Sequence, residues 1–180
     1  MRYSPWPVFV SGVGKSAFIA MKMSASLKSL GIPSVFVHPC EAMHGDIGVV
    51  HPEACMVIIS KSGNSSEIIQ MLPSLCSRCI KIIAICNVEE SPLGVNADVF
   101  LPLHCKKEGD TTNMVPLIST ETCLHICNYL TLKIAEEIDF TKERFAYNHP
   151  NGQIGYNLKN RVSDIVVWNE RKPFVSSDTS

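Results

Sequence analysis

A hydroxyl-rich segment at residues 59–67, which reads ISKSGNSSE, combines residue types that bind an anion and move a proton. The apolar run at 56–59 predicts a buried strand, and the apolar positions 68, 69, 72 and 75 predict a helix. Hydroxyls and free backbone N–H groups at a helix N-terminus attract anions, and we expect phosphate. Glu67, in the first turn of that helix, would then lie beside whatever carries the phosphate.

The same residues also have a purely structural interpretation. Asn64 and Glu67 stand three residues apart, which fits a capping box that only closes the start of a helix. A strand followed by a Ser/Gly loop and a helix occurs in many α/β proteins. The segment alone therefore leaves both interpretations open.

Residues 12–16, which read GVGKS, form a second glycine-containing loop before a helical pattern. A Walker A loop needs a further glycine five positions before Gly14, where Phe9 stands, and this argues against nucleotide hydrolysis. A dinucleotide-binding loop needs an acidic residue at the end of the second strand, where Val37 and His38 stand instead. Two interpretations of Lys15 remain, namely a cation directed at an anion or a substrate oxygen, and a solvated lysine at a helix start.

The composition favours one domain of 180 residues, long enough to bury a core. A net charge of −1 argues against a nucleic-acid surface, and no apolar run reaches membrane-spanning length. The first seven residues lack the apolar stretch of a signal peptide. We therefore expect a cytoplasmic protein with no nucleic-acid or membrane partner.

The eight cysteines do not have the pattern of a disulfide-rich secreted protein. Several stand inside apolar runs and are expected to be buried thiols, namely Cys55, Cys86, Cys123 and Cys127. Cys76 and Cys79 form a C-x-x-C pair at the end of a predicted helix, where the helix dipole disfavours a thiolate, so no redox role is expected. His38, Cys40 and His44 lack a second cluster that would complete a ligand set, so we expect no metal.

Short apolar runs alternate with helical periods, which predicts a parallel sheet covered by helices on both faces. The predicted strands lie at 8–10, 34–37, 56–59, 80–86 and 99–101, and a polar loop is expected at 103–115. Helices are predicted at about 16–30, 65–76, 116–138 and 141–147, with a short one within 38–48, Pro116 in a first turn and Thr141 as an N-cap. Ligands bind beyond the carboxyl ends of such strands, where the loops carry Gly14, Lys15, residues 60–67 and Glu108.

Taken together, these segments resemble the sugar isomerase (SIS) domain, and within it the arabinose-5-phosphate isomerases of 3-deoxy-manno-octulosonate (Kdo), lipopolysaccharide and capsule synthesis. The matching stretches fall in family order over residues 8–165, at 12–16, 37–39, 44–48, 59–67, 107–108, 149–155 and 161–165. The His-Gly-Asp stretch at 44–46 and the His-Pro-x-Gly-x-x-Gly stretch at 149–155 are more specific to this subfamily than the serine-rich loop, which all SIS domains share.

The resemblance implies a three-layer α/β sandwich with a five-stranded parallel sheet, the flavodoxin-like SIS fold. It also implies reversible isomerisation between D-arabinose 5-phosphate and D-ribulose 5-phosphate through an enediol, with no metal or organic cofactor. This chemistry needs a base for the proton between C1 and C2, a group for the O1/O2 proton, and a cation or donor for the developing oxyanion. SIS domains generally form dimers or tetramers with shared sites, so a homo-oligomer that binds a sugar-phosphate substrate is implied.

Carried onto this sequence, the resemblance implies four catalytic residues, Lys15, Glu67, Glu108 and His149. Lys15 suits oxyanion stabilisation, and either glutamate could be the base on carbon. His149 suits ring opening or proton shuttling, because histidine side chains exchange protons near neutral pH. Taken alone, Glu108 in the charged loop 106–110 would be interpreted as solvated, and His149 as a residue that caps a turn. The implied substrate- and phosphate-binding residues are Gly14, Ser16, His44, Ser60, Ser62, Gly63, Ser65 and Ser119.

The expected organisation is an SIS domain over residues 1–167 and a polar tail at 168–180, without cystathionine-β-synthase-type modules. The chain departs from the family pattern at 116–120, which read PLIST where relatives commonly carry a Pro-Thr-Ser-Ser-Thr-like run, and in the short segment before its first strand. Two alternatives therefore stay open: a non-catalytic sugar-phosphate-binding or sensing module, and an isomerase of another sugar phosphate. Retention of the four candidate catalytic residues favours an isomerase.

Overall fold

The structure is a computed structural model that describes residues 5–152. It divides into two compact units, Met1–Phe140 and Thr141–Ser180, and each is described here by itself. In the first unit the strands are β1 (Val8–Gly12), β2 (Ser34–Phe36), β3 (Cys55–Ile59), β4 (Lys81–Cys86) and β5 (Val99–Pro102). Its helices are α1 (Lys15–Ser29), α2 (Pro39–Met43), the 3₁₀ helix η1 (Asp46–Val49), α3 (Ser66–Ser77), α4 (Pro92–Val95) and α5 (Ile118–Glu137). The described part of the second unit contains α6 (Lys142–Asn148).

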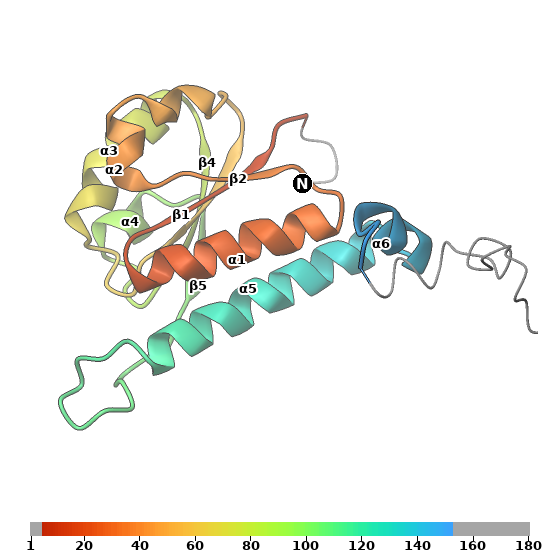
Figure 1. The fold of residues 1–180 in the computed structure, drawn as a ribbon. Coiled ribbons are helices and arrows are strands. Elements are labelled where there is room, and N and C mark those ends of the chain that lie inside the picture. The colour runs from red at the N-terminus through yellow and green to blue at the C-terminus, as the bar shows by residue number, and fades with distance from the viewer. Residues whose placement is uncertain (1–4, 153–180) are drawn as a thin grey trace, which may run out of the picture. The chain divides into compact units, whose positions relative to one another are not determined.

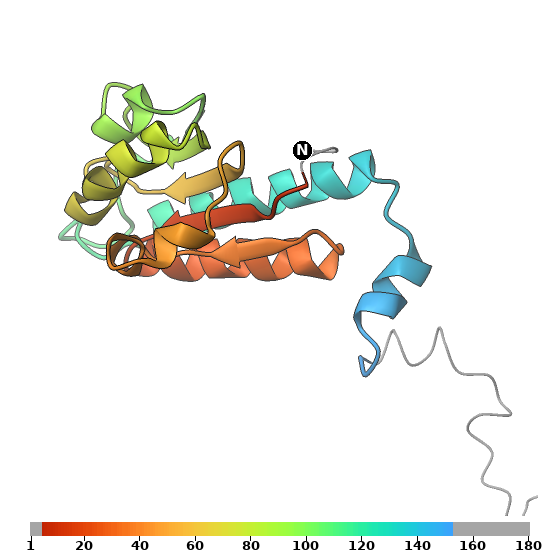
Figure 2. The same ribbon diagram turned by 90° about the horizontal axis from the view of Figure 1, so that it is seen from above.

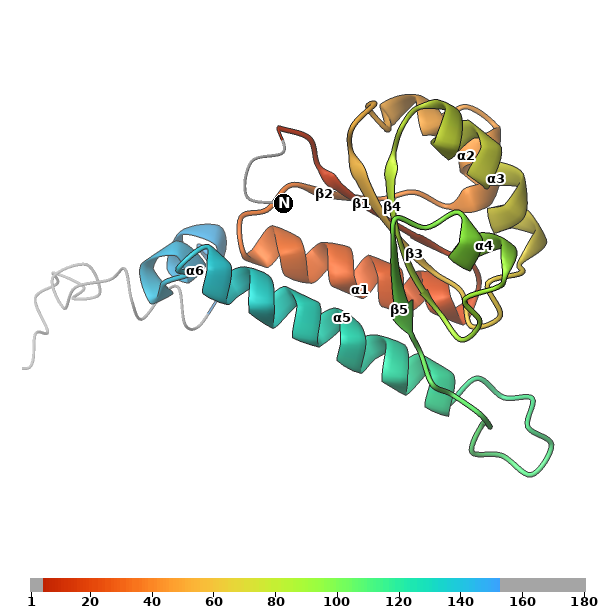
Figure 3. The ribbon, with the colours of Figure 1, turned by 180° about the vertical axis from the view of Figure 1, so that it is seen from behind.

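The five strands form one parallel sheet in the order β2-β1-β3-β4-β5, which confirms the predicted α/β fold (Figure 1). Helices α1 and α5 cover one face of the sheet, and α2, α3 and α4 cover the other (Figures 2 and 3). Side chains alternate between the two faces along each strand. Phe9 and Ile58 therefore enter the core beneath α3, whereas Val10 and Ile59 enter the core beneath α1 and α5.

The order of the strands reverses at β1, which lies between β2 and β3. In an open parallel sheet such a reversal leaves a crevice at the carboxyl ends of the two central strands, because the chain leaves them toward opposite faces. Here the reversal directs the loop after β1 into α1 and the loop after β3 into α3. The two loops that the sequence singled out thus lie at one crevice.

Two helix starts differ from the sequence-based prediction. Helix α3 has Ser65 as its N-cap residue, and its Glu67 carboxylate accepts a hydrogen bond from the Ser66 hydroxyl at 2.9 Å. The capping box between Asn64 and Glu67, which was one of the two interpretations left open, is therefore not formed. Helix α5 begins at Ile118, so Pro116 precedes the helix and does not stand in its first turn. Thr141 caps α6 as predicted, because its hydroxyl accepts a hydrogen bond from the Arg144 N–H at 3.3 Å.

Several sequence features lie outside the described residues. These are the family-like stretches at 153–155 and 161–165 and the polar tail at 168–180. Within residues 5–152, no helix combines the length and apolar character needed to cross a membrane. All eight cysteines are free thiols.

Gly63, in the loop after β3, has both a restricted backbone conformation and a close neighbour. Its φ is +66°, and an added Cβ would stand 2.0 Å from the Ser91 hydroxyl oxygen. That hydroxyl is fixed, because it donates to the Val88 carbonyl at 2.6 Å and accepts from the Gly94 N–H. Glycine at this position therefore lets the loop after β3 pack against the turn before α4.

We expect Gly63→Ala to lower the free energy of unfolding by about 1–3 kcal/mol, because alanine adds backbone strain and a steric clash. Urea unfolding followed by circular dichroism measures this change. Gly48→Ala is the matched control, since a Cβ at Gly48 meets nothing within 4 Å. Equal stabilities of the two variants would contradict the close packing of this loop.

Candidate active site

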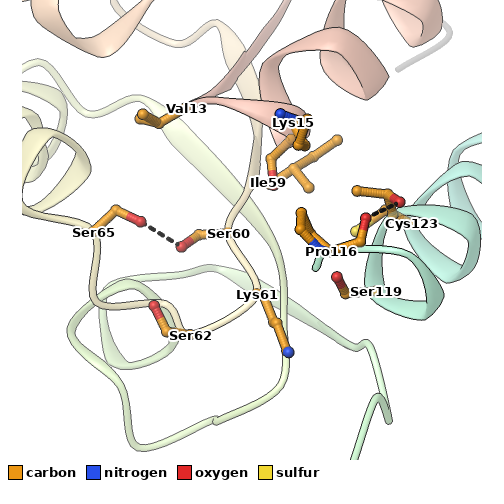
Figure 4. Close-up of a pocket in the computed structure, with 12 residues that line it drawn as sticks. Val13, Lys15, Ile59, Ser60, Lys61, Ser62, Ser65, Pro116, Ser119 and Cys123 are labelled. Carbon is orange, nitrogen blue, oxygen red and sulfur yellow. Dashed lines mark hydrogen bonds between the residues drawn. The ribbon is translucent and has the colours of Figure 1, made fainter. Parts of the chain in front are cut away.

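A pocket of about 310 Å³ lies at the crevice where the strand order reverses. Three segments form its walls: the loop after β1, the loop after β3, and the first turns of α5 (Figure 4). The lining residues are Val13, Lys15, Ser16, Ile59, Ser60, Lys61, Ser62, Ser65, Pro116, Ser119, Thr120 and Cys123. Six of the twelve residues proposed from the sequence line it, namely Lys15, Ser16, Ser60, Ser62, Ser65 and Ser119.

The loop after β3 presents three serines to this pocket, and they form the serine wall: Ser60, Ser62 and Ser65. The Ser60 hydroxyl lies 3.1 Å from the Ser65 hydroxyl and accepts the Gly63 N–H at 3.2 Å, so the loop is folded tightly around it. The Ser62 hydroxyl accepts the Asn64 N–H at 3.1 Å. The N-cap residue Ser65 makes no side-chain capping bond to α3, and its hydroxyl lies against that of Ser60 instead. This arrangement of hydroxyls and a helix N-terminus suits an anion.

The loop after β1 places Lys15 on another wall of the pocket. Gly14 is the N-cap residue of α1 and has a φ of 58°, a conformation that favours glycine. Gly12 lets the strand approach the helix closely, because an added Cβ would stand 3.1 Å from the Ser16 backbone. The two glycines thus allow the tight turn that brings Lys15 and Ser16 to the pocket.

Helix α5 supplies the third wall. The Thr120 hydroxyl donates to the Pro116 carbonyl at 2.7 Å, so this hydroxyl already has an acceptor within its own turn. Burial raises the pKa of the Cys123 thiol to about 12, which makes Cys123 a poor nucleophile at neutral pH. The α5 wall therefore contributes shape and the buried Ser119 rather than a reactive group.

Glu108 is not solvated, because its side chain is only 1% exposed and lies behind the pocket wall. One carboxylate oxygen, Oε1, accepts a hydrogen bond from Lys61 Nζ at 2.6 Å. The other, Oε2, accepts the backbone N–H groups of Leu117 at 3.0 Å and Ser119 at 3.1 Å. Burial alone would raise the pKa of Glu108, but the hydrogen bonds from Lys61 and Ser119 outweigh it and hold that pKa at about 2.

The loop that carries Glu108 is ordered by its own side chains. The Asn113 amide oxygen accepts the Glu108 N–H at 2.6 Å. The Asp110 carboxylate accepts the backbone N–H groups of Met114 and Val115 as well as the Thr112 hydroxyl, and these hydrogen bonds lower the pKa of Asp110 to about 2. The predicted polar loop is therefore a compact structure that presents Glu108 to α5.

Glu67 lies in the first turn of α3, next to the serine wall but outside the pocket lining. Its own backbone N–H and the Ser66 hydroxyl lower the pKa of its carboxyl. Because the side chain is only partly buried, a change of rotamer suffices to move the carboxylate. Of the two candidate bases, Glu67 is thus the one with freedom to reach a ligand.

The remaining proposed residues do not line the pocket. His44 is the exposed C-cap residue of α2, and Gly63 packs against Ser91 instead of facing the pocket. His149 belongs to the second unit, where its ring stacks on Phe145 at a centroid distance of 3.9 Å and its Nδ1 lies 2.8 Å from the Phe145 carbonyl oxygen. It is the C-cap residue of α6, in agreement with its capping interpretation.

Lys61 was missed by the sequence-based choice of site residues. It lies between Ser60 and Ser62, lines the pocket, and is the ion-pair partner of Glu108. Its position at the carboxyl end of a buried strand, inside an anion-binding loop, is a signal that could have identified it.

The contacts of Glu108 predict how pH affects stability. Its pKa lies below the ordinary value of 4.5, so its contribution to the free energy of unfolding is complete above about pH 4.5 and is lost as the pH falls toward 2. We therefore expect Glu108→Gln to be less stable than the wild type at pH 7, with a difference that shrinks steadily below pH 4.5. Urea unfolding of both proteins over this pH range provides the test. A difference that stays constant down to pH 2.5 would contradict the role of the ionised carboxylate.

A family model described as "SIS domain" matches residues 7–128 of this chain. The arabinose 5-phosphate isomerase KpsF of Escherichia coli is 41% identical over 159 residues, which are 88% of this chain and 50% of the relative. The arabinose 5-phosphate isomerase KdsD of Yersinia pestis is 38% identical over 173 residues, which are 96% of this chain and 53% of the relative. The chain thus spans about half the length of the curated relatives it matches.

A solved structure from E. coli CFT073, in complex with A5P, has the same fold. Its sequence is 35% identical, its TM-score is 0.79, and the similarity covers 81% of this chain and 78% of that chain. The family match covers both loops of the pocket, the loop that carries Glu108, and the first turns of α5. The chain therefore belongs to the SIS domain family.

Proposed function

We propose that this protein interconverts D-arabinose 5-phosphate and D-ribulose 5-phosphate through an enediol intermediate. The observation that carries the proposal is the pocket at the strand-order reversal, which brings Lys15 and Lys61 together with the three serines before α3. The relatives named arabinose 5-phosphate isomerase and the similar structure in complex with A5P support it. One pocket therefore has hydroxyls that suit an anion and lysines that suit an oxyanion.

We assign the phosphate group to the serine wall. Hydroxyl donors and the N-terminal end of α3 stabilise a dianion without requiring many cations. With the phosphate held there, the open-chain sugar extends toward the walls formed by Lys15 and by α5. Lys15 then stabilises the negative charge that develops on the carbonyl oxygen.

The isomerisation moves one hydrogen between two carbons. A carboxylate takes the proton from C2 of the aldose while the C1 oxygen gains a proton, which gives the enediol. Return of a proton to C1, with loss of the proton from the C2 oxygen, completes the ketose. We assign the base role to Glu67, because Glu108 is buried and ion-paired. The ring-opening role of His149, which belongs to the second unit, is assigned from the family resemblance.

One observation favours the non-catalytic alternative. Neither Glu67 nor Glu108 lines the pocket, and the Glu108 side chain is 1% exposed. A module that only binds a sugar phosphate needs the serine wall and a cation but no base. One result distinguishes the isomerase from the binding module, because a binding module binds the sugar phosphate without converting it.

Several finer expectations accompany the proposal. A role in Kdo, lipopolysaccharide or capsule synthesis and a cytoplasmic location stay predictions. So does the homo-oligomer with shared sites, which one surface feature supports. Helices α1 and α5 pack side by side (Figure 1) and expose Phe18 and Met21 on one and Tyr129 and Leu132 on the other. Exposed apolar side chains of this size, on adjacent helices, are typical of a protein interface.

We expect conversion of arabinose 5-phosphate to ribulose 5-phosphate in D₂O, with deuterium incorporated at C1, as measured by proton NMR. Glu67→Gln and His149→Ala should each lower kcat at least 100-fold, because a positioned acid or base contributes roughly 10²- to 10⁴-fold. Both variants should keep the wild-type circular dichroism spectrum.

The matched control is Glu121→Gln, which changes a first-turn glutamate of α5 that does not line the pocket. This variant should retain wild-type turnover. If Glu67→Gln and His149→Ala also turn over at the wild-type rate, the assignment of these residues is wrong. If the wild type binds the sugar phosphate and converts none, the protein is a binding module.

We expect light scattering after size exclusion to report a dimer or tetramer, and Phe18→Glu to shift it toward the monomer. Phe18 is 63% exposed on α1, and burying a new carboxylate in an apolar interface disfavours association. Val95→Glu is the control, because Val95 is 68% exposed on α4, which covers the other face of the sheet. A monomeric wild-type protein would contradict the homo-oligomer.

A further inference from the structure

Lys61 has a fixed backbone and a side chain that reaches two different environments. Its carbonyl accepts the Asn87 N–H at 2.9 Å, which ties the loop after β3 to the residue that follows β4. Its side chain lines the pocket and remains 38% exposed. In Figure 4 the Lys61 side chain leaves the loop in a direction away from the Ser60 and Ser65 hydroxyls. Its ammonium group lies against the buried Glu108 carboxylate. A change of its side-chain rotamer would therefore bring the ammonium group to a ligand in the pocket.

The ion pair between Lys61 and Glu108 is asymmetric. Glu108 is held in place by the Leu117 and Ser119 N–H groups on Oε2, in addition to Lys61 on Oε1. An ammonium group has three donors, and within residues 5–152 Lys61 Nζ uses one of them, on Glu108. The carboxylate thus stays positioned when the lysine moves, and the lysine has donors left for a second anion.

We propose that Lys61 is a phosphate-binding residue of this pocket. Its ion pair with Glu108 keeps the lysine near the pocket, and the phosphate of a bound ligand shares the ammonium group with Glu108 or replaces Glu108 as its partner. The inference rests on the proposed function only in that the pocket accepts a phosphate group; it does not require turnover. Lys61 flanks Ser60 and Ser62, whose side chains line the same wall. A phosphate dianion at the serine wall therefore competes with the Glu108 carboxylate for the same cation.

The competition has a consequence for Glu108. The hydrogen bond from Lys61 is the largest of the contacts that lower the pKa of this carboxyl. When the phosphate draws the ammonium group away and adds its own negative charge, that pKa rises. Ligand binding would thus make the buried carboxylate a better proton acceptor at the moment when the sugar is in place.

A double-mutant cycle with inorganic phosphate as the probe tests the proposal, with Kd measured by isothermal titration calorimetry at pH 7.5. We expect Lys61→Gln to weaken phosphate binding at least 10-fold, because it removes a charge-assisted hydrogen bond. We expect Glu108→Gln to tighten binding several-fold, because it releases Lys61 from its competitor. In the double variant the tightening should disappear, because the cation that it acts through is gone.

Lys106→Gln is the matched control, since it removes an exposed lysine two residues from Glu108 that does not line the pocket. It should bind phosphate as the wild type does. If Lys61→Gln folds poorly because Glu108 loses its partner, the double variant, which removes both charges, still reports the phosphate affinity without Lys61.

Two results would overturn the inference: wild-type phosphate affinity in both variants that lack Lys61, or tightening by Glu108→Gln that persists without Lys61. These results are independent of the proposed function. Phosphate binding that depends on Lys61, in a protein without isomerase turnover, supports the inference and contradicts the isomerase. Isomerase turnover in a protein whose phosphate binding does not depend on Lys61 contradicts the inference and supports the isomerase.

Discussion

The contacts of the buried Glu108 carboxylate hold the walls of the pocket together. A buried carboxylate without partners costs several kcal/mol, so its partners are constrained to remain where they are. Here those partners come from different parts of the chain: Lys61 from the loop after β3, and the Leu117 and Ser119 N–H groups from the start of α5. Removing both carboxylate oxygens would loosen the loop and the helix start together, whereas a glutamine keeps one oxygen that can accept the two N–H groups. The position of the α5 wall, and with it the shape of the pocket, therefore depends on these acceptors.

The charges around the pocket are few and arranged for an anion. Lys15 and Lys61 are the lysines among the lining residues, and Glu108 behind the wall offsets part of their charge. Most of the remaining polar groups in the lining are neutral hydroxyls. Neutral donors stabilise a dianion by orientation and need no counter-charge when the pocket is empty. A pocket with this composition therefore has little repulsion between like charges, and under the proposed function a phosphate would supply the negative charge that pairs with its lysines.

Local patterns in the sequence were sufficient for the order of the strands and helices along the chain and for the serine wall, because apolar periodicity is decided within a few residues. They were insufficient for Glu108, whose partner Lys61 is 47 positions away along the chain. In the sequence the residue stands among lysines and glycine, a composition typical of a solvated loop. Only the tertiary fold reveals that Asn113 and the start of α5 enclose it. The predicted start of α5 at Pro116 was wrong for the same reason, because the helix begins at Ile118. The N–H groups of Leu117 and Ser119 at this helix start bind the Glu108 carboxylate, and the local sequence around Pro116 does not reveal that contact.

Both candidate bases have lowered pKa values, and a carboxylate of low pKa is a weak base toward carbon. The causes differ. Hydrogen bonds from its own N–H and from the Ser66 hydroxyl lower the pKa of Glu67. Hydrogen bonds from Lys61 and Ser119 lower the pKa of Glu108. Under the proposed function, a phosphate at the serine wall would act on both, because it would bring negative charge to the end of α3 and compete for Lys61. The ligand would therefore raise the proton affinity of the two carboxylates through the same contacts that bind it, so that the base is strengthened only when the sugar is bound.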